Sequence, residues 1–196
     1  RADLGVSADD LLAVFQDGSG HNPGRGLTEL LEAMKTLENV RLLIIGSGDR
    51  IGEARHKVQN EGLERKVVFL PRMNWNELIC WLKCCDVGLS IDMDTCVNQR
   101  YSLPNKLFDA IVSGLPVIVS PLPEVSATVR RYGCGLVIDE VTPRVIAEKL
   151  AALRDDRLAL QELKAKAEEA APDLSWDNEK TREQDFFRSV IEKRIK

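Results

Sequence analysis

The sequence predicts a doubly wound α/β fold, in which helices cover both faces of a six-stranded parallel sheet. Six short apolar segments rich in Val, Ile and Leu recur along the chain, and segments with helical spacing of apolar residues separate them. The apolar segments show little of the apolar–polar alternation that marks a sheet with one solvated face. Strands that are apolar on both sides and alternate with helices are typical of a covered parallel sheet.

Each expected strand stops at a glycine, a proline or a polar residue. The strands are expected at residues 11–16, 40–45, 67–70, 87–91, 117–120 and 135–138. The first is followed by a glycine-rich loop over 17–26, and the fourth by a long polar loop over 92–103. Helices are expected from residue 27 past 34, and at 51–61, 75–84, 105–113, 124–132, 145–153, 158–170 and 178–193. Gly62 suits a helix C-cap and Asn74 suits an N-cap.

Polar side chains follow several of these strands at one edge of the expected sheet. In open parallel sheets, ligands bind outside the carboxyl ends of the strands, where the strand order reverses. Arg25 lies in the segment after the first strand, residues 71–73 follow the third, and residues 102–109 follow the fourth. The topology therefore predicts that segments far apart in sequence meet at this edge.

The stretch from Asn105 to Asp109 carries the chemistry of a nucleotide site. Lys106 and Asp109 are three residues apart, so they share a face of the expected helix. They lie in its first turn, where free N–H groups and the helix dipole favour an anion. A cation and N–H donors suit phosphate, and a carboxylate suits ribose hydroxyls. Arg25, between Gly24 and Gly26 before the first helix, also suits phosphate. The alternatives are an ordinary capped helix and a flexible turn with a solvated arginine.

Composition excludes some classes of function. The chain has 196 residues, 44% hydrophobic and 30% charged, with a net charge of −4, which fits one globular domain. The absence of a cationic block argues against nucleic-acid binding. No apolar run approaches the ~20 residues of a membrane span, and no signal peptide is visible, so a cytoplasmic location is expected. The five cysteines fit a reducing compartment, and we interpret Cys80 and Cys84 as small buried hydrophobes rather than metal ligands.

Other chemistry is weakly supported by the sequence. Residues 46–52 loosely resemble a dinucleotide fingerprint, and Arg72 could meet a 2′-phosphate, but the motif follows the second strand and leaves Arg25 and Lys106 without a role. Asp92 and Asp94 could hold a divalent cation, although two acids in a loop are usually only solvated. No nucleophile elbow, zinc-ligand spacing or P-loop is present.

In order and spacing, a set of short motifs resembles the C-terminal, donor-binding domain of retaining glycosyltransferases of the GT-B architecture (group 1, glycosyltransferase family 4). The motifs are GRG at 24–26, LIIGSG at 43–48, EGL at 61–63, VVFL at 67–70, DVGL at 86–89, PNKLFDA at 104–110, GLPVI at 114–118 and GLVI at 135–138. The resemblance covers nearly the whole chain. It implies a Rossmann-like domain that forms one half of the architecture.

The resemblance implies a nucleotide-diphosphate sugar as donor, transferred with retention to a glycan or lipid acceptor, without a metal or another cofactor. It places Arg25, with Gly24, on the diphosphate and the turn of Pro71, Arg72 and Met73 at the base. It places the backbone of Ser102, Leu103, Pro104 and Asn105 near the phosphates and sugar, and Asp109 on the ribose. For Lys106, part of a variant motif, we expect a phosphate role, and we expect Arg25 and Lys106 to be the catalytic residues.

The chain also departs from the family pattern. The family's first glutamate falls at Tyr101, so the resemblance supplies no carboxylate contact to the sugar here, and a second basic residue of the first loop has no match at Ser19 or Gly20. The resemblance implies that the acceptor-binding half lies outside this chain. Residues 1–177 are therefore expected to form the nucleotide-sugar domain. Residues 178–196 are expected to pack on the absent half, leaving Phe186, Phe187 and Val190 poorly covered.

Further expectations concern the cell and the alternatives. We expect a role in glycan biosynthesis in the cytoplasm, or at the cytoplasmic face of a membrane through contacts of the missing half. The alternatives are a GT-B-like nucleotide-sugar epimerase, an NAD(P)-dependent oxidoreductase, and a non-catalytic nucleotide-binding or interaction module.

Overall fold

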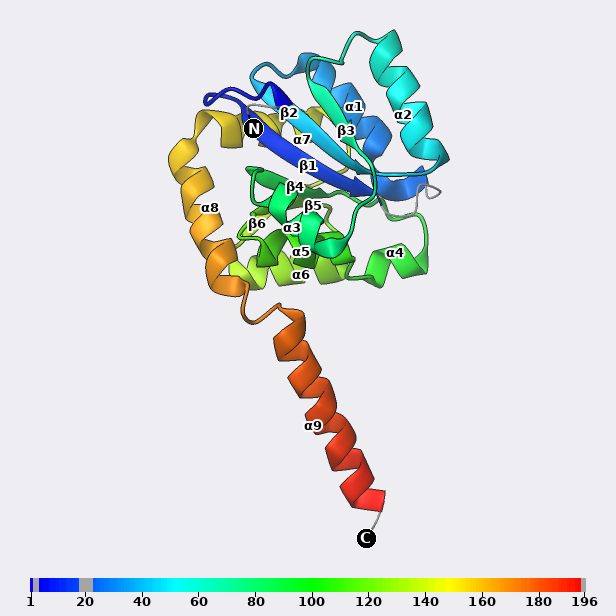
Figure 1. The fold of residues 1–196 in the computed structure, drawn as a ribbon, viewed down its shortest axis with the longest axis vertical. Coiled ribbons are helices and arrows are strands. Elements are labelled where there is room, and N and C mark those ends of the chain that lie inside the picture. The colour runs from blue at the N-terminus through cyan, green and yellow to red at the C-terminus, as the bar shows by residue number, and fades with distance from the viewer. Residues whose placement is uncertain (2–3, 18–22, 195–196) are drawn as a thin grey trace.

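The computed structural model describes residues 1, 4–17 and 23–194, so the predictions at Ser19 and Gly20 lie outside it. Its centre is a six-stranded sheet in the order β3-β2-β1-β4-β5-β6, in which neighbouring strands run parallel (Figure 1). The strands are β1 Leu11–Asp17, β2 Val40–Gly46, β3 Val67–Leu70, β4 Val87–Ser90, β5 Val117–Val119 and β6 Gly135–Val137. The predicted doubly wound α/β fold is confirmed.

The helices lie close to the expected positions. They are α1 Leu27–Thr36, α2 Asp49–Asn60, α3 Trp75–Leu82, α4 Val97–Tyr101, α5 Asn105–Val112, α6 Pro123–Tyr132, α7 Pro143–Asp155, α8 Arg157–Ala170 and α9 Trp176–Arg194, with a 3₁₀ turn at Pro23–Arg25. The predicted caps are also present, since Asn74 accepts a hydrogen bond from the amide of Glu77 and Gly62 has a φ of +68°. Helix α4 corrects the prediction of an unbroken loop over 92–103. Five residues are too few to show helical periodicity in a sequence.

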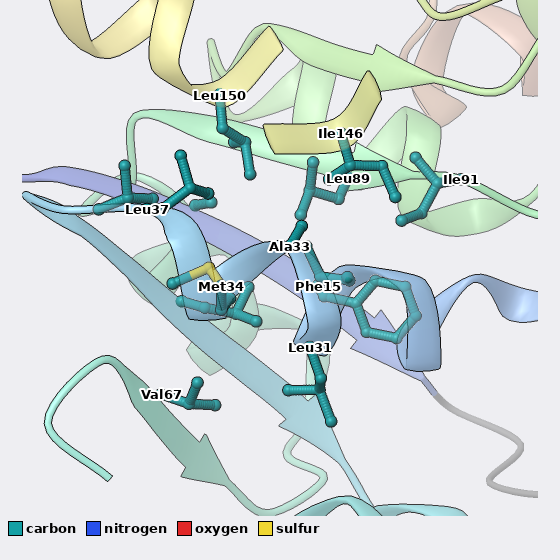
Figure 2. Close-up of a cluster of buried hydrophobic side chains, with 14 of the residues drawn as sticks. Phe15, Leu31, Ala33, Met34, Leu37, Val67, Leu89, Ile91, Ile146 and Leu150 are labelled. Carbon is teal, nitrogen blue, oxygen red and sulfur yellow. The ribbon is translucent and has the colours of Figure 1, made fainter. Parts of the chain in front are cut away.

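Alternate residues of the strands face two separate hydrophobic cores. On one face, Ala13 and Phe15 pack with residues of α1, α2 and α7. On the other, Leu12 and Val14 pack with residues of α3, α5, α6 and α8. Figure 2 shows part of the first core, where Phe15 lies next to Leu31 and Ala33 of α1, and Ile146 of α7 lies above them. Both faces of the sheet are therefore covered, which is why the strands lack alternation in the sequence.

Helix α9 extends away from the rest of the molecule (Figure 1). Phe186 and Phe187 on this helix are 63% and 59% exposed, as expected, and their rings contact each other edge to face. That α9 packs on another domain stays a prediction. None of the described helices combines the length and apolar character needed to cross a membrane.

The interpretation of Cys80 and Cys84 as buried hydrophobes is wrong. Both residues are exposed: Cys80 lies on α3, which buries Leu82, and Cys84 lies in the turn after the helix ends. Cys85 and Cys134 are buried, and burial raises the pKa of the Cys85 thiol to about 12. All five cysteines are free.

Leu150 of α7 tests the packing on the first face. Its side chain is fully buried, so Leu150→Ala should lower the free energy of unfolding by about 2–5 kcal/mol, through lost burial and the cavity that remains. Leu158→Ala in α8, where the leucine is 79% exposed, should change it by less than about 0.5 kcal/mol. Urea denaturation of both variants measures the difference, and equal losses would contradict the described core.

Candidate functional site

A cavity of about 740 Å³ opens at the carboxyl ends of the strands. The strand order reverses between β1 and β4, and the ends of β1 and β2 together with the segments that leave β1, β3 and β4 form its wall. Of the predicted site residues, those that line it are Arg25, Arg72, Met73, Leu103, Pro104, Asn105, Lys106 and Asp109. The topology thus brings together the three loops that the sequence placed at this edge.

Three predicted site residues are not in the wall of this cavity: Gly24, Pro71 and Ser102. Pro71 is exposed, and the Ser102 hydroxyl donates to the backbone oxygen of Gln99 at 3.3 Å. Sequence reasoning in turn missed six residues that line the cavity, which are Gln16, Ile45, Gly46, Asn74, Trp75 and Leu78. Gln16 and Gly46 stand at strand ends, so their positions were a usable signal. Trp75 follows a predicted N-cap and gave none.

The two glycines that flank Arg25 serve loop packing. Gly26 has a φ of +76°, and a Cβ there would lie 2.4 Å from the backbone oxygen of Ile91. A Cβ on Gly24 would meet the Thr95 side chain at 2.9 Å, and the Gly24 oxygen accepts from the amide of Met93 at 2.7 Å. These contacts join the loop after β1 to the segment after β4. The glycines therefore let the two loops meet, and this contact fixes the position of Arg25.

A buried ion pair lies beside the cavity. The ammonium Nζ of Lys106 donates to Oδ1 of Asp92 at 2.9 Å, and both side chains are less than one-tenth exposed. The Arg25 Nε lies 3.7 Å from the same Asp92 oxygen, so both cations share one carboxylate. Lys106 Nζ also lies 5.2 Å from the centre of the Phe15 ring. Burial lowers the pKa of Lys106, and the Asp92 carboxylate opposes that shift.

The acids considered as ligands for a divalent cation each contact a basic side chain. Asp92 pairs with Lys106, and Asp94 accepts three hydrogen bonds from Arg100, at 2.7 to 3.0 Å. Within the described ranges, no group of three or more His, Cys, Asp or Glu residues is placed to hold a metal ion. In this structure both Asp92 and Asp94 therefore form ion pairs with basic side chains.

Asp109 of α5 and Trp75 of α3 contact each other in the wall of the cavity. The indole Nε1 of Trp75 donates to Oδ1 of Asp109 at 3.0 Å. Burial raises the pKa of Asp109, and the indole hydrogen bond acts against this rise. Tyr101, at the position of the family's first glutamate, is 57% exposed at the end of α4 and is not in the cavity wall. The cavity thus presents cations, the N-terminal turn of α5 and one carboxylate.

Comparison with known proteins gives a family. The family model described as "Glycosyl transferases group 1" matches residues 21–173. A D-inositol 3-phosphate glycosyltransferase of Corynebacterium glutamicum is 27% identical over 186 residues, which are 90% of this chain and 43% of that protein. The chain spans less than half the length of the curated relatives that it matches.

Solved structures share the fold. Sucrose-phosphate synthase of Thermosynechococcus elongatus superposes with a TM-score of 0.79 at 19% identity, over 97% of this chain and 48% of that one. HepE of Anabaena, solved in complex with UDP-glucose, gives a TM-score of 0.74 at 17% identity, over 94% of this chain and 50% of that one. At these identities the likeness concerns the fold, and in each case the chain corresponds to about half of the solved protein.

The ion pair of Asp92 and Lys106 predicts unequal effects for two neighbouring acids. Asp92→Ala should lower the free energy of unfolding by about 3–5 kcal/mol, because it leaves a buried ammonium without a counter-ion. Asp94→Ala, which breaks an exposed pair, should cost less than about 1 kcal/mol. Adding Lys106→Met to Asp92→Ala should recover most of the loss. Urea denaturation measures all three variants, and similar losses for the two acids would show that the pair is not buried in solution.

Proposed function

Because this chain belongs to the group 1 glycosyl transferases, we propose that its cavity binds the nucleotide diphosphate of a sugar donor. The observation that carries the proposal is the composition of the cavity at the strand reversal. Arg25, the first turn of α5 and Asp109 all line it, and these are groups suited to phosphate and to ribose. HepE, which shares the fold, was solved in complex with UDP-glucose, and this supports a donor of the same class here.

Each group has a role in this proposal. Arg25 and the free amides at the start of α5 hold the diphosphate and offset the negative charge that grows on it as the glycosidic bond to the nucleotide breaks. Lys106 lines the cavity and adds its positive charge there, while one of its three N–H groups donates to Asp92. Arg72 and Met73 lie beside the base, and Asp109 accepts from the ribose hydroxyls. Catalysis then consists of positioning and charge stabilisation, with no metal required.

The acceptor side of the reaction belongs to the rest of the protein. We infer that the sugar passes with retention to a glycan or lipid acceptor held by a second domain. Residues 178–196, of which 178–194 belong to α9, pack on that domain and cover Phe186 and Phe187. The full protein then works in glycan biosynthesis, in the cytoplasm or at the cytoplasmic face of a membrane.

The dinucleotide alternative has less support. Residues 46–52 follow β2, whereas the strand order reverses between β1 and β4. In the dinucleotide fingerprint the last glycine allows close packing of helix and strand, but a Cβ added at Gly52 would meet nothing within 4 Å. Gly48, with a φ of +106°, serves the turn into α2, and Gly46 allows β2 to lie close to the backbone oxygen of Asp17. No second function is proposed.

Calorimetric titration of the chain with UDP, GDP, ADP and NADPH tests the proposal. At least one diphosphate should bind, and NADPH should bind more weakly than that diphosphate. Binding of NADPH alone would favour the oxidoreductase. If none of the four ligands bound, the donor-site proposal would be wrong.

Arg25 should matter to the diphosphate in particular. Arg25→Ala should weaken binding of the preferred nucleoside diphosphate by about 1–3 kcal/mol, the scale of a charge-assisted hydrogen bond, and should affect the matching nucleoside much less. Arg144→Ala, which removes an exposed arginine of α7, is the matched control and should leave both affinities unchanged. Equal behaviour of the two variants in calorimetry would remove Arg25 from the site.

A further inference from the structure

Trp75 has an unusual environment for a tryptophan. It is the first residue of α3 and is 58% exposed, so burial does not explain a large aromatic side chain at this position. Its one polar atom, the indole Nε1, donates to Asp109. Both residues line the nucleotide cavity, and both also line a second, mostly apolar cavity of about 720 Å³ between α3, α5 and the start of α9. Trp75 and Asp109 thus form part of the wall that the two cavities share.

The two residues come from helices that are anchored independently. The backbone amide of Glu77 donates a hydrogen bond to Oδ1 of Asn74 at 3.0 Å, and this cap fixes the start of α3 next to Trp75. On α5, the neighbours Leu107, Ala110 and Ile111 are buried in the second core. Because both backbones are held, the indole hydrogen bond sets the direction of the Asp109 side chain.

This hydrogen bond occupies one oxygen of the carboxylate. Oδ1 accepts from Trp75, and within the described part of the chain no hydrogen bond reaches Oδ2. The carboxylate is partly removed from water, so its charged form benefits from each donor that it receives. A hydroxyl group on a ligand would supply the hydrogen-bond donor that Oδ2 lacks in the described part of the chain.

We propose that Trp75 is a positioning residue for the ribose of the donor nucleotide: it holds Oδ1 of Asp109 so that Oδ2 accepts from a ribose hydroxyl. The inference rests on the proposed function, because it assumes a nucleotide in the main cavity. Trp75 acts through Asp109 and does not select the base. A tryptophan that instead stacked on the base would contribute through its ring face, which phenylalanine also offers.

The test measures discrimination between ribose and dideoxyribose. Wild type, Trp75→Phe, Asp109→Asn and the double variant are titrated by calorimetry with UDP, GDP and ADP, each beside its 2′,3′-dideoxy analogue. Trp75→Phe should bind the preferred ribonucleotide about tenfold more weakly, the order of one charge-assisted hydrogen bond, and the dideoxy analogue with unchanged affinity. Asp109→Asn should also lose its preference for the ribonucleotide over the dideoxy analogue. The double variant should show no greater loss of this preference than Asp109→Asn alone.

Trp176→Phe is the matched control. Trp176 is 66% exposed and lines the second cavity but not the first, so its replacement should leave discrimination intact. Thermal unfolding of each variant checks the fold. If Trp75→Phe kept wild-type discrimination, or weakened both sugars equally, the positioning role would be wrong while the donor site stood. If the wild-type chain bound no diphosphate, the proposed function itself would fail.

Discussion

The pairing of β1 with β4 is the constraint on which the site depends. Ala13, Val14 and Phe15 of β1 pair with residues 87–89 of β4, and α1, after β1, and α5, the second helix after β4, pack on opposite faces of the sheet. The segments that leave β1 and β4 therefore diverge beyond the strand ends and leave a cavity between them. Close packing sets the height of α5, since a Cβ on Gly88 would lie 2.9 Å from the Cβ of Ala110. That packing carries Lys106 over Phe15 and toward Asp92.

The ion pair of Asp92 and Lys106 bears on both the stability of the fold and the proposed binding of a diphosphate. A buried ion pair costs desolvation on both sides, so the pair of Asp92 and Lys106 is poorly explained as a source of stability alone. In the proposed site it does something else. It keeps an ammonium and the Arg25 guanidinium on one carboxylate beside the cavity, where an incoming diphosphate would compete for both. The same pair ties the segment after β4 to α5, so the loop geometry and the charge of the site are set together.

Much of this was predictable from the sequence, because apolar runs and strand ends are local signals. The strands, the caps at Asn74 and Gly62, and the meeting of Arg25, Lys106 and Asp109 at one edge all follow from pattern and topology. What could not be predicted depends on contacts between distant segments. The glycines around Arg25 looked suited to a ligand, and the structure shows them packed against the loop after β4. Trp75 stands at the start of an expected helix with no local sign of its partner, and it contacts Asp109, 34 residues away.

The central claim is that a nucleoside diphosphate binds at the strand reversal. A third cavity, of about 660 Å³, is lined by Arg1, Arg154 and Arg157 among others, and although Asp86 and Asp155 pair with two of these arginines, it is a competing place for an anion. Mapping of backbone amide chemical shifts by NMR during titration with UDP, GDP or ADP separates the two most directly. The account predicts that the largest shifts fall on the amides of residues 72–75 and 105–109. Shifts confined to the residues around Arg154 and Arg157 would contradict it.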